Sequence, residues 1–247
     1  MSFLLPQATS TDVAALGADI AVLPVGSFEQ HGPYLPLITD TVVACLIAER
    51  VARDYDLILL PPLTISCSHE HAAFPGTVSI RAQTLMTIVD DITASLQASG
   101  VKSLVLVNGH GGNYALRNSV QQATVSGPTM ALFPGGGDWD RARHDADCKT
   151  SQHEDMHAGE LEASLLLHGA PHLIRQGFAE SDHEADDRSD LLVLGMGAYT
   201  SSGVIGRPSL GTADKGALIL DSLSASFARL LEVLTDAKDR SAQDQAW

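Results

Sequence analysis

The stretch that decides the fold is IAVLPVGSFEQHGPYLPLITD, residues 20–40, in which a short apolar run leads into a polar loop. The run Ile20–Val25 is aliphatic and closed by a glycine, which is typical of a strand buried on both faces. Three side chains of types that bind metals, Glu29, His31 and Asp40, follow it directly. This order predicts a ligand-binding loop at the end of a buried strand.

The rest of the chain alternates between short apolar runs and segments with helical spacing. Further strands are expected over residues 57–63, 104–107 and 129–133. Apolar residues recur at helical spacing over residues 42–51 and 85–96, and a last amphipathic helix is expected over 213–235. Because strands apolar on both faces need cover on each side, the pattern predicts an α/β fold with a mostly parallel sheet, and the length suits one domain over residues 1–247.

Composition excludes several classes of partner. Thirty acidic against fifteen basic residues give a net charge of −15, which disfavours nucleic acid and anionic membranes. No apolar stretch approaches the roughly 18 residues that span a bilayer, and the first ten residues lack the pattern of a signal peptide. The cysteines, Cys45, Cys67 and Cys148, form neither a CxxC motif nor an even set. We therefore expect a cytoplasmic protein with reduced thiols.

Polar side chains follow each expected strand. In an open parallel sheet the loops after the carboxyl ends of the strands share one edge, where ligands bind. Sequence-distant residues are therefore expected to converge there. They are Glu29 and His31 after the first strand, His69 and His71 after the second, His110 in NGHGGN after the third, and Asp138 after the fourth.

Glutamate, aspartate and histidine without cysteine form a ligand set that suits zinc, manganese or ferrous iron. Glu29 and His31 alternate, which places both on one side of an extended segment, although a surface ion pair would give the same pattern. The neighbouring glycine and prolines stiffen this loop without an obvious surface purpose. Asp40 is the candidate to bridge two ions, and its alternative is a helix N-cap. The loop is interpreted as part of a two-metal site.

The segment HAGELEASLLL adds His157 and Glu160, three residues apart on what is expected to be one face of a helix start. Glu160 could complete the ligand set or simply favour the helix N-terminus. His157 then lies near enough to act as a general acid or base. Glu162 is expected on another face, with a structural or interface role.

Other residues are assigned to the substrate or left open. His69 and His71, on either side of Glu70, are expected to contact substrate or a neighbouring subunit, with core or surface roles as the alternative. Asp138 and Trp139 open the long polar segment 135–156, expected as an irregular, lid-like loop, and are placed in the substrate site. NGHGGN could also cradle phosphate, but it lacks the spacing of the known phosphate loops.

Five blocks of sequence together resemble the creatininase, or creatinine amidohydrolase, family. They are LPVGSFEQHGPYLPLITD, PPLTISCSHEHAAFPGTVSI, VLVNGHGGN, HAGELEASLLL and SSGVIGRPSLGTADKG, in the family's order over about residues 20–220. The resemblance implies a three-layer α/β/α sandwich, a homohexamer and two divalent ions at the carboxyl edge of the sheet. It implies that Glu29, His31, Asp40 and His110 are metal ligands, with Asp40 bridging, and that His157 is a catalytic-site histidine.

One departure separates this chain from true creatininases. They resemble NGHYEN at the third-strand loop and take a glutamate ligand from it, where this chain has Gly112. Members with NGHGGN are expected to draw that carboxylate from the HAGE segment, which makes Glu160 the candidate. Creatinine is then not the expected substrate. Relatives with this loop resemble formamide-cleaving deformylases of flavin and deazaflavin pathways and the peptidase of mycofactocin maturation.

The sequence thus predicts a metal-dependent amidohydrolase that cleaves an amide, formamide or lactam bond of a small molecule or short peptide. Two divalent ions, zinc first and manganese or iron as alternatives, would activate the water. A non-catalytic metal- or nucleotide-binding protein that kept the fold is the alternative function.

Overall fold

The computed structural model describes residues 5–127 and 129–244, and a four-stranded parallel sheet forms its centre. The strands are β1 (Ile20–Val25), β2 (Ile58–Leu59), β3 (Ser103–Asn108) and β4 (Met130–Phe133), in the spatial order β2-β1-β3-β4. The central pair runs in register from Ile20 opposite Ser103 to Val25 opposite Asn108. The loops that follow β1 and β3 therefore leave the sheet side by side.

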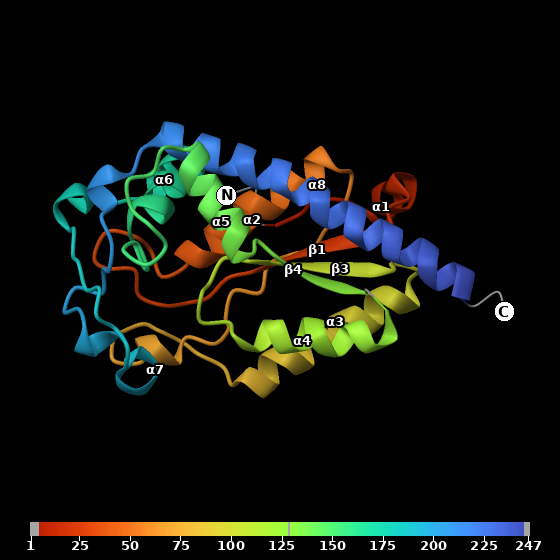
Figure 1. Cartoon of the computed structure of the whole chain (residues 1–247), viewed down its shortest axis with the longest axis horizontal. Coiled ribbons are helices and arrows are strands. Elements are labelled where there is room, and N and C mark those ends of the chain that lie inside the picture. Colours follow the sequence, from red (N-terminus) through yellow and green to blue (C-terminus); the bar gives the residue numbers. More distant parts are fainter. Residues whose placement is uncertain (1–4, 128, 245–247) are drawn as a thin grey trace.

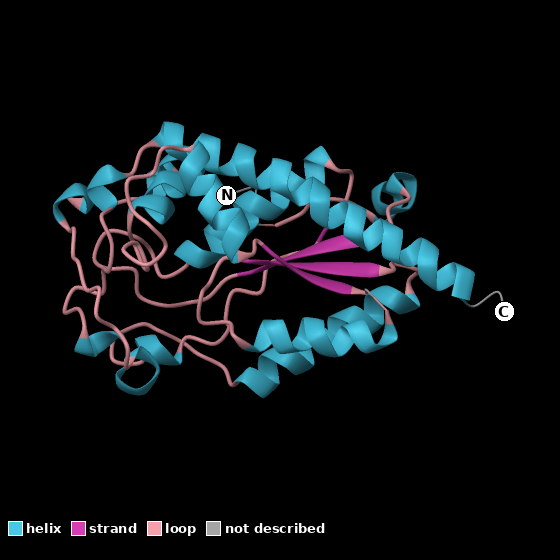
Figure 2. Ribbon diagram, in the orientation of Figure 1, coloured by secondary structure: helices cyan, strands magenta, loops and turns pink. Residues whose placement is uncertain are grey.

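Helices cover both faces of the sheet, which confirms the three-layer α/β/α fold (Figure 1). On one face lie α3 (Ala82–Ala98) and α4 (Ala115–Ala123), and on the other lie α2 (Thr39–Asp54), α5 (Gly136–Asp145), α6 (Glu160–Gly169) and α8 (Ala213–Asp244). The short helices α1 (Ser10–Leu16) and α7 (Leu191–Leu194) lie outside these layers. Long loops gather at one end of the sheet, opposite the end toward which α8 extends (Figure 2).

Two apolar cores result from the alternation of side chains along the strands. Ile20 and Val22 of β1 pack with α2, α5, α6 and α8, while Ala21, Leu23 and Val25 pack with α3 and α4. Every residue of β1 is buried. The continuous apolar run that predicted this strand therefore reflects burial on both faces.

Three expectations about element lengths need correction. β2 ends at Leu59 because the next residues include Pro61 and Pro62, which have no N–H to donate to a neighbouring strand. The segment 135–156 is not an irregular loop, since its first part is α5, whose Ala142 belongs to the core. The last helix extends past residue 235 to Asp244. Within the described residues, no helix is both long and apolar enough to cross a membrane.

Candidate metal centre

The loop after β1 and the start of α2 bring three predicted residues together. Glu29, His31 and Asp40 are all buried. The Nδ1–H group of His31 donates to the backbone carbonyl of Glu29 at 3.1 Å, which leaves a lone pair on Nε2 of the neutral ring. That Nε2 lies 3.0 Å from Oδ1 of Asp40. Two acceptors that face each other at this distance need a proton or a metal cation between them.

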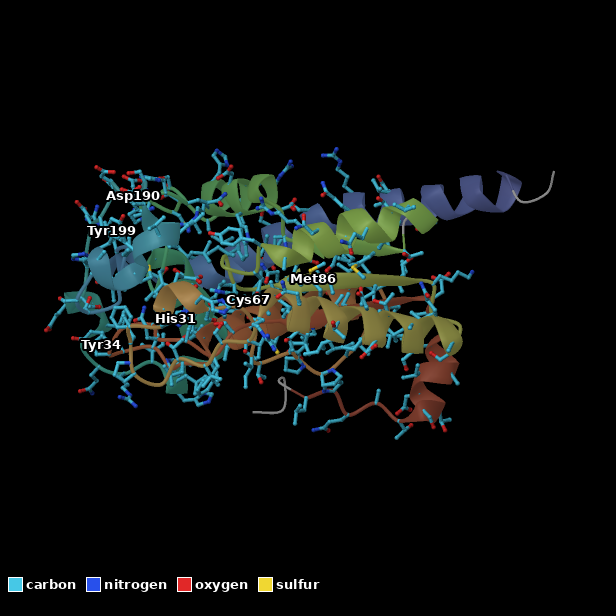
Figure 3. All side chains as sticks on the ribbon, turned by 90° about the horizontal axis from the view of Figure 1, so that it is seen from below. His31, Tyr34, Cys67, Met86, Asp190 and Tyr199 are labelled. Carbon is cyan, nitrogen blue, oxygen red and sulfur yellow. The ribbon has the colours of Figure 1, made fainter. Side chains whose placement is uncertain are left out.

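His110, after β3, repeats this arrangement from the other side. Its Nε2–H donates to the carbonyl of Cys67 at 2.8 Å, so Nδ1 is the nitrogen available to a ligand. Nδ1 lies 3.0 Å from Oδ2 of Asp40 and 3.2 Å from Oε1 of Glu29. Asp40 thus presents one oxygen to each histidine, and the hydroxyl of Ser27 donates to Oδ2 at 2.6 Å and orients it. Figure 3 labels His31 and Cys67 in the loops at this end of the sheet.

The carboxylate of Glu29 is the feature that best fits a cation. Its side chain is fully buried, and neither oxygen makes a hydrogen bond to any part of the chain that the structure describes. An unpartnered buried charge is costly, unless a metal or another cation compensates for it. Imidazole nitrogens of His71 and His110 lie 3.2 Å from Oε1, and one of His157 lies 3.8 Å away. Hard oxygen and imidazole donors are those that zinc, manganese and iron accept.

Glu162, and not Glu160, is the glutamate of α6 that reaches this cluster. Oε1 of Glu162 lies 3.7 Å from Nε2 of His31, and His31, Asp40 and Glu162 offer donor atoms within 4.8 Å of one another. Glu162 Oε2 accepts the backbone N–H of Ala158 at 2.6 Å, which fixes the side chain. The spacing of the sequence alone predicts a structural or interface role for Glu162.

Glu160 points to the opposite side, which corrects its expected place in the ligand shell. Its buried carboxylate accepts the backbone N–H groups of Lys149 and Thr150 at 2.9 Å and pairs with Nζ of Lys215 at 2.5 Å. Residues two apart on a helix differ by about 200° in direction, so Glu160 and Glu162 cannot both face the metal centre. Glu160 instead connects Lys149 and Thr150, which precede α6, to Lys215 of α8.

His157 and Glu160 do not share a helix face, because α6 begins only at Glu160. His157 is not in the helix, because it forms a single bridge with the extended residue Ile205, and Ala158 has the left-handed φ of 56°. Only then does α6 begin, and the carboxylate of Asp155 accepts the N–H groups of Glu160 and Leu161. Side-chain directions before and after this turn are unrelated to helical spacing.

His157 and His71 both belong to the cluster. The Nε2–H of His157 donates to the carbonyl of Gln30 at 2.6 Å, which turns Nδ1 toward Glu29. The Nδ1 of His71 accepts the amide of Gln30 at 2.9 Å, so its proton resides on Nε2. Burial, reinforced by neighbouring histidines, lowers the pKa of both rings. They are therefore neutral imidazoles beside a centre of opposite charges.

Charges in the cluster compensate one another. Burial alone would raise the pKa of Asp40, but His31 and His110 outweigh it and hold the pKa well below its ordinary range. Burial would likewise lower the pKa of His31, which Asp40 and Glu162 raise well above its usual value. The pKa of His110 is raised in the same way by Glu29 and Asp40. The chain thus holds positive charge at the positions where cations would be bound.

Of the remaining predicted residues, Trp139 lines a cavity at the site and Asp138 does not. A cavity of about 240 Å³ reaches His110 and Glu162 and has Trp139, Tyr114 and Arg117 in its wall. Asp138 does not line it, because its carboxylate accepts the N–H of Gly135 at 2.8 Å and caps α5.

His69 lies outside the cluster, where its Nδ1 is 3.3 Å from the hydroxyl of Ser79. It lines a second cavity of about 400 Å³ together with Glu70, Gly112 and α7. No spacing or motif in the sequence singles out Glu70.

Sequence comparison matches this chain to a protein family and to individual relatives. The model of the family described as "Creatininase: Creatinine amidohydrolase" matches residues 6–231. A "Mycofactocin precursor peptide peptidase" of Mycobacterium tuberculosis (strain ATCC 25618 / H37Rv) is 33% identical over 237 residues, covering 89% of this chain and 86% of the relative. A "Creatinine amidohydrolase" of Pseudomonas putida is 34% identical over 101 residues, which is 39% of each chain.

Solved structures share the fold at low identity. A "Crystal structure of creatinine amidohydrolase (creatininase)" has a TM-score of 0.77 at 23% identity and covers 91% of this chain and 95% of the other. A variant creatininase described as "Zn-Zn type" has a TM-score of 0.77 at 23% identity, with 95% and 99% covered. A structure described as "Creatininase Mn" has a TM-score of 0.75 at 23% identity, with 92% and 97% covered.

Proposed function

The chain belongs to the creatininase family, and we propose that it is a metal-dependent amidohydrolase that cleaves an amide, formamide or lactam bond of a small molecule or short peptide. The observation that carries the proposal is the buried carboxylate of Glu29, which accepts no hydrogen bond from the described residues and lies among imidazole nitrogens. The short-peptide part of the substrate class is supported by the mycobacterial relative, which is named as a peptidase.

Five residues are proposed to hold two divalent ions. Glu29 and His110 would bind one ion, His31 and Glu162 the other, and Asp40 would bridge them, since each of its oxygens already faces one histidine. Zinc is the first choice and manganese or iron the alternatives, supported by relatives of known structure described with Zn and with Mn. When bound, such ions polarise a carbonyl and lower the pKa of water toward roughly 7.

The chain's own residues then bind and protonate the substrate. His157 is neutral, and its Nδ1 faces the centre because Nε2–H is held by the carbonyl of Gln30. Its free Nδ1 is placed to take a proton from the attacking water and then to pass that proton to the leaving nitrogen. The cavity with Trp139 and Tyr114 in its wall would accept the rest of the substrate. His71 orders Gln30 and has no ligand role in this proposal.

The domain organisation, assembly and location of the chain are also proposed. The family match over residues 6–231 supports one domain over 1–247. A homohexamer and a cytoplasmic location rest on the resemblance alone, which is an argument by analogy. The charge of −15 supports the absence of nucleic acid and anionic membrane partners.

The decisive experiment is a titration followed by a screen. Chelator-treated protein is reloaded with Zn²⁺, Mn²⁺ or Fe²⁺, the bound ions are counted by elemental analysis, and each form is tested against formamides, lactams, creatinine and short peptides with products detected by mass. We expect about two ions per chain and turnover only when they are bound. Turnover without metal would overturn the mechanism, and nucleotide binding without metal would favour the alternative function.

A further inference from the structure

Gly112 leaves a space at the metal centre that another residue fills. Its φ is not in the left-handed region, so the backbone itself does not require glycine. A Cβ atom on residue 112 would lie 2.0 Å from Oε1 of Glu70 and 2.4 Å from Nε2 of His110. The glycine is therefore needed for room, and the group that occupies this room is the carboxylate of Glu70.

Glu70 reaches this space from a different strand end. It lies in the short 3-10 helix η2 (His69–His71), which follows β2, whereas Gly112 follows β3. Its Oε1 lies 3.4 Å from Nε2 of His110, the nitrogen that also faces the carbonyl of Cys67. Glu29, Glu70 and His110 nevertheless offer donor atoms that all lie within 4.8 Å of one another. These three residues therefore form one of the groups in the described chain that could hold an ion.

This carboxylate can be reached from solvent. The side chain is 17% exposed and lines the cavity of about 400 Å³ shared with Gly112. An ion beside it would thus have a path from solvent, as a metal site requires.

We propose that Glu70 is a carboxylate ligand of the ion held by Glu29 and His110, delivered from η2 into the space that Gly112 leaves. This inference rests on the proposed two-metal function and adds to its ligand set. A further carboxylate strengthens the attraction for a divalent cation in a site that water screens weakly. Positions 70 and 112 are alternatives, because only one of them can place a side chain in this space.

The test compares Zn²⁺ and Mn²⁺ binding by calorimetry and elemental analysis for the full-length protein and variants after chelator treatment. Glu70→Ala and Glu70→Gln are expected to weaken one of the two ions by at least about 10-fold. Gly112→Glu should also weaken the binding of one ion, because the new side chain would displace Glu70 and clash with Nε2 of His110. Glu232→Ala, an exposed glutamate of α8, is the matched control.

The outcomes separate this inference from the proposed function. A wild-type protein that binds no ion would refute the proposed function. Two ions bound with unchanged affinity in Glu70→Ala would refute the role of Glu70 alone. If Glu70→Gln binds both ions with wild-type affinity while Glu70→Ala does not, the carboxylate is not a ligand and the inference fails. Thermal unfolding of each metal-free variant identifies any that simply does not fold, and Glu70→Asp then provides a milder substitution.

Discussion

Asp40 meets His31 through one carboxylate oxygen, with Oδ1 3.0 Å from Nε2. The other oxygen, Oδ2, lies 3.0 Å from Nδ1 of His110. Each ring donates the N–H of its other nitrogen to a backbone carbonyl, so in the neutral ring these two nitrogens would be the ones free to bind an ion. One carboxylate therefore connects two ligand positions from different loops, as a bridge between two ions requires.

Replacing this bridge should remove both ions at once. Asp40→Asn keeps the shape of the side chain but removes the charge, so we expect binding of both ions to weaken by more than the roughly 10- to 100-fold typical of an outer-shell partner. Turnover should be lost with the metal. Elemental analysis after dialysis measures this directly, with Asp91→Asn on the surface of α3 as control. An Asp40→Asn protein that retains two ions would contradict the bridging role.

The two glutamates of α6 should respond to substitution in opposite ways. Glu162→Ala is expected to weaken the ion at His31 while leaving the free energy of unfolding of the metal-free protein nearly unchanged. Glu160→Ala should leave Lys215 without its buried partner and destabilise the protein by about 3–5 kcal/mol. Metal titration and urea unfolding, performed on both variants, separate the two effects. Equal loss of metal in both variants would contradict this assignment.

Low pH should also lower the free energy of unfolding, because Glu160 becomes protonated. Burial would raise its pKa, but Lys215, Thr150 and backbone N–H groups lower it below the ordinary 4.5. A lowered pKa in the folded state stabilises the protein above 4.5, and this contribution is lost as the pH falls through the folded value. With chelator present, the free energy of unfolding should therefore fall more steeply below pH 4.5 for the wild type than for Glu160→Gln. Parallel curves would show that Glu160 does not contribute.

The sequence predicted most members of the buried cluster for a topological reason. Glu29, His31 and His110 follow parallel strands that are neighbours in the sheet, so the strand pattern alone placed them at one edge. Two carboxylates that the sequence did not predict there, Glu162 and Glu70, depend on features that spacing does not encode. Glu162 depends on the left-handed turn at Ala158, and Glu70 depends on the space beside Gly112.

Replacing Trp139 should weaken substrate binding without changing metal binding. Trp139 lines the cavity beside His110 but contacts none of the proposed ligands in the described hydrogen bonds and ion pairs. Trp139→Ala should raise KM by roughly 10-fold, since a buried aromatic contact is worth 1–2 kcal/mol or more, while two ions remain bound. Steady-state kinetics with the substrate found in the screen, together with elemental analysis, would measure both. A variant with normal KM would remove Trp139 from the substrate site.

His157 should affect the chemical step and not the metal. Its Nδ1 lies 3.8 Å from Glu29, farther than the ligand contacts of His110, and its Nε2–H is held by the carbonyl of Gln30. Because it is neutral and faces the centre, its loss should remove proton transfer and lower kcat by roughly 10²- to 10⁴-fold. His157→Gln keeps a hydrogen-bonding side chain but cannot transfer a proton in the same way. We therefore expect two bound ions, an unchanged melting temperature and a low kcat; loss of an ion instead would make His157 a ligand.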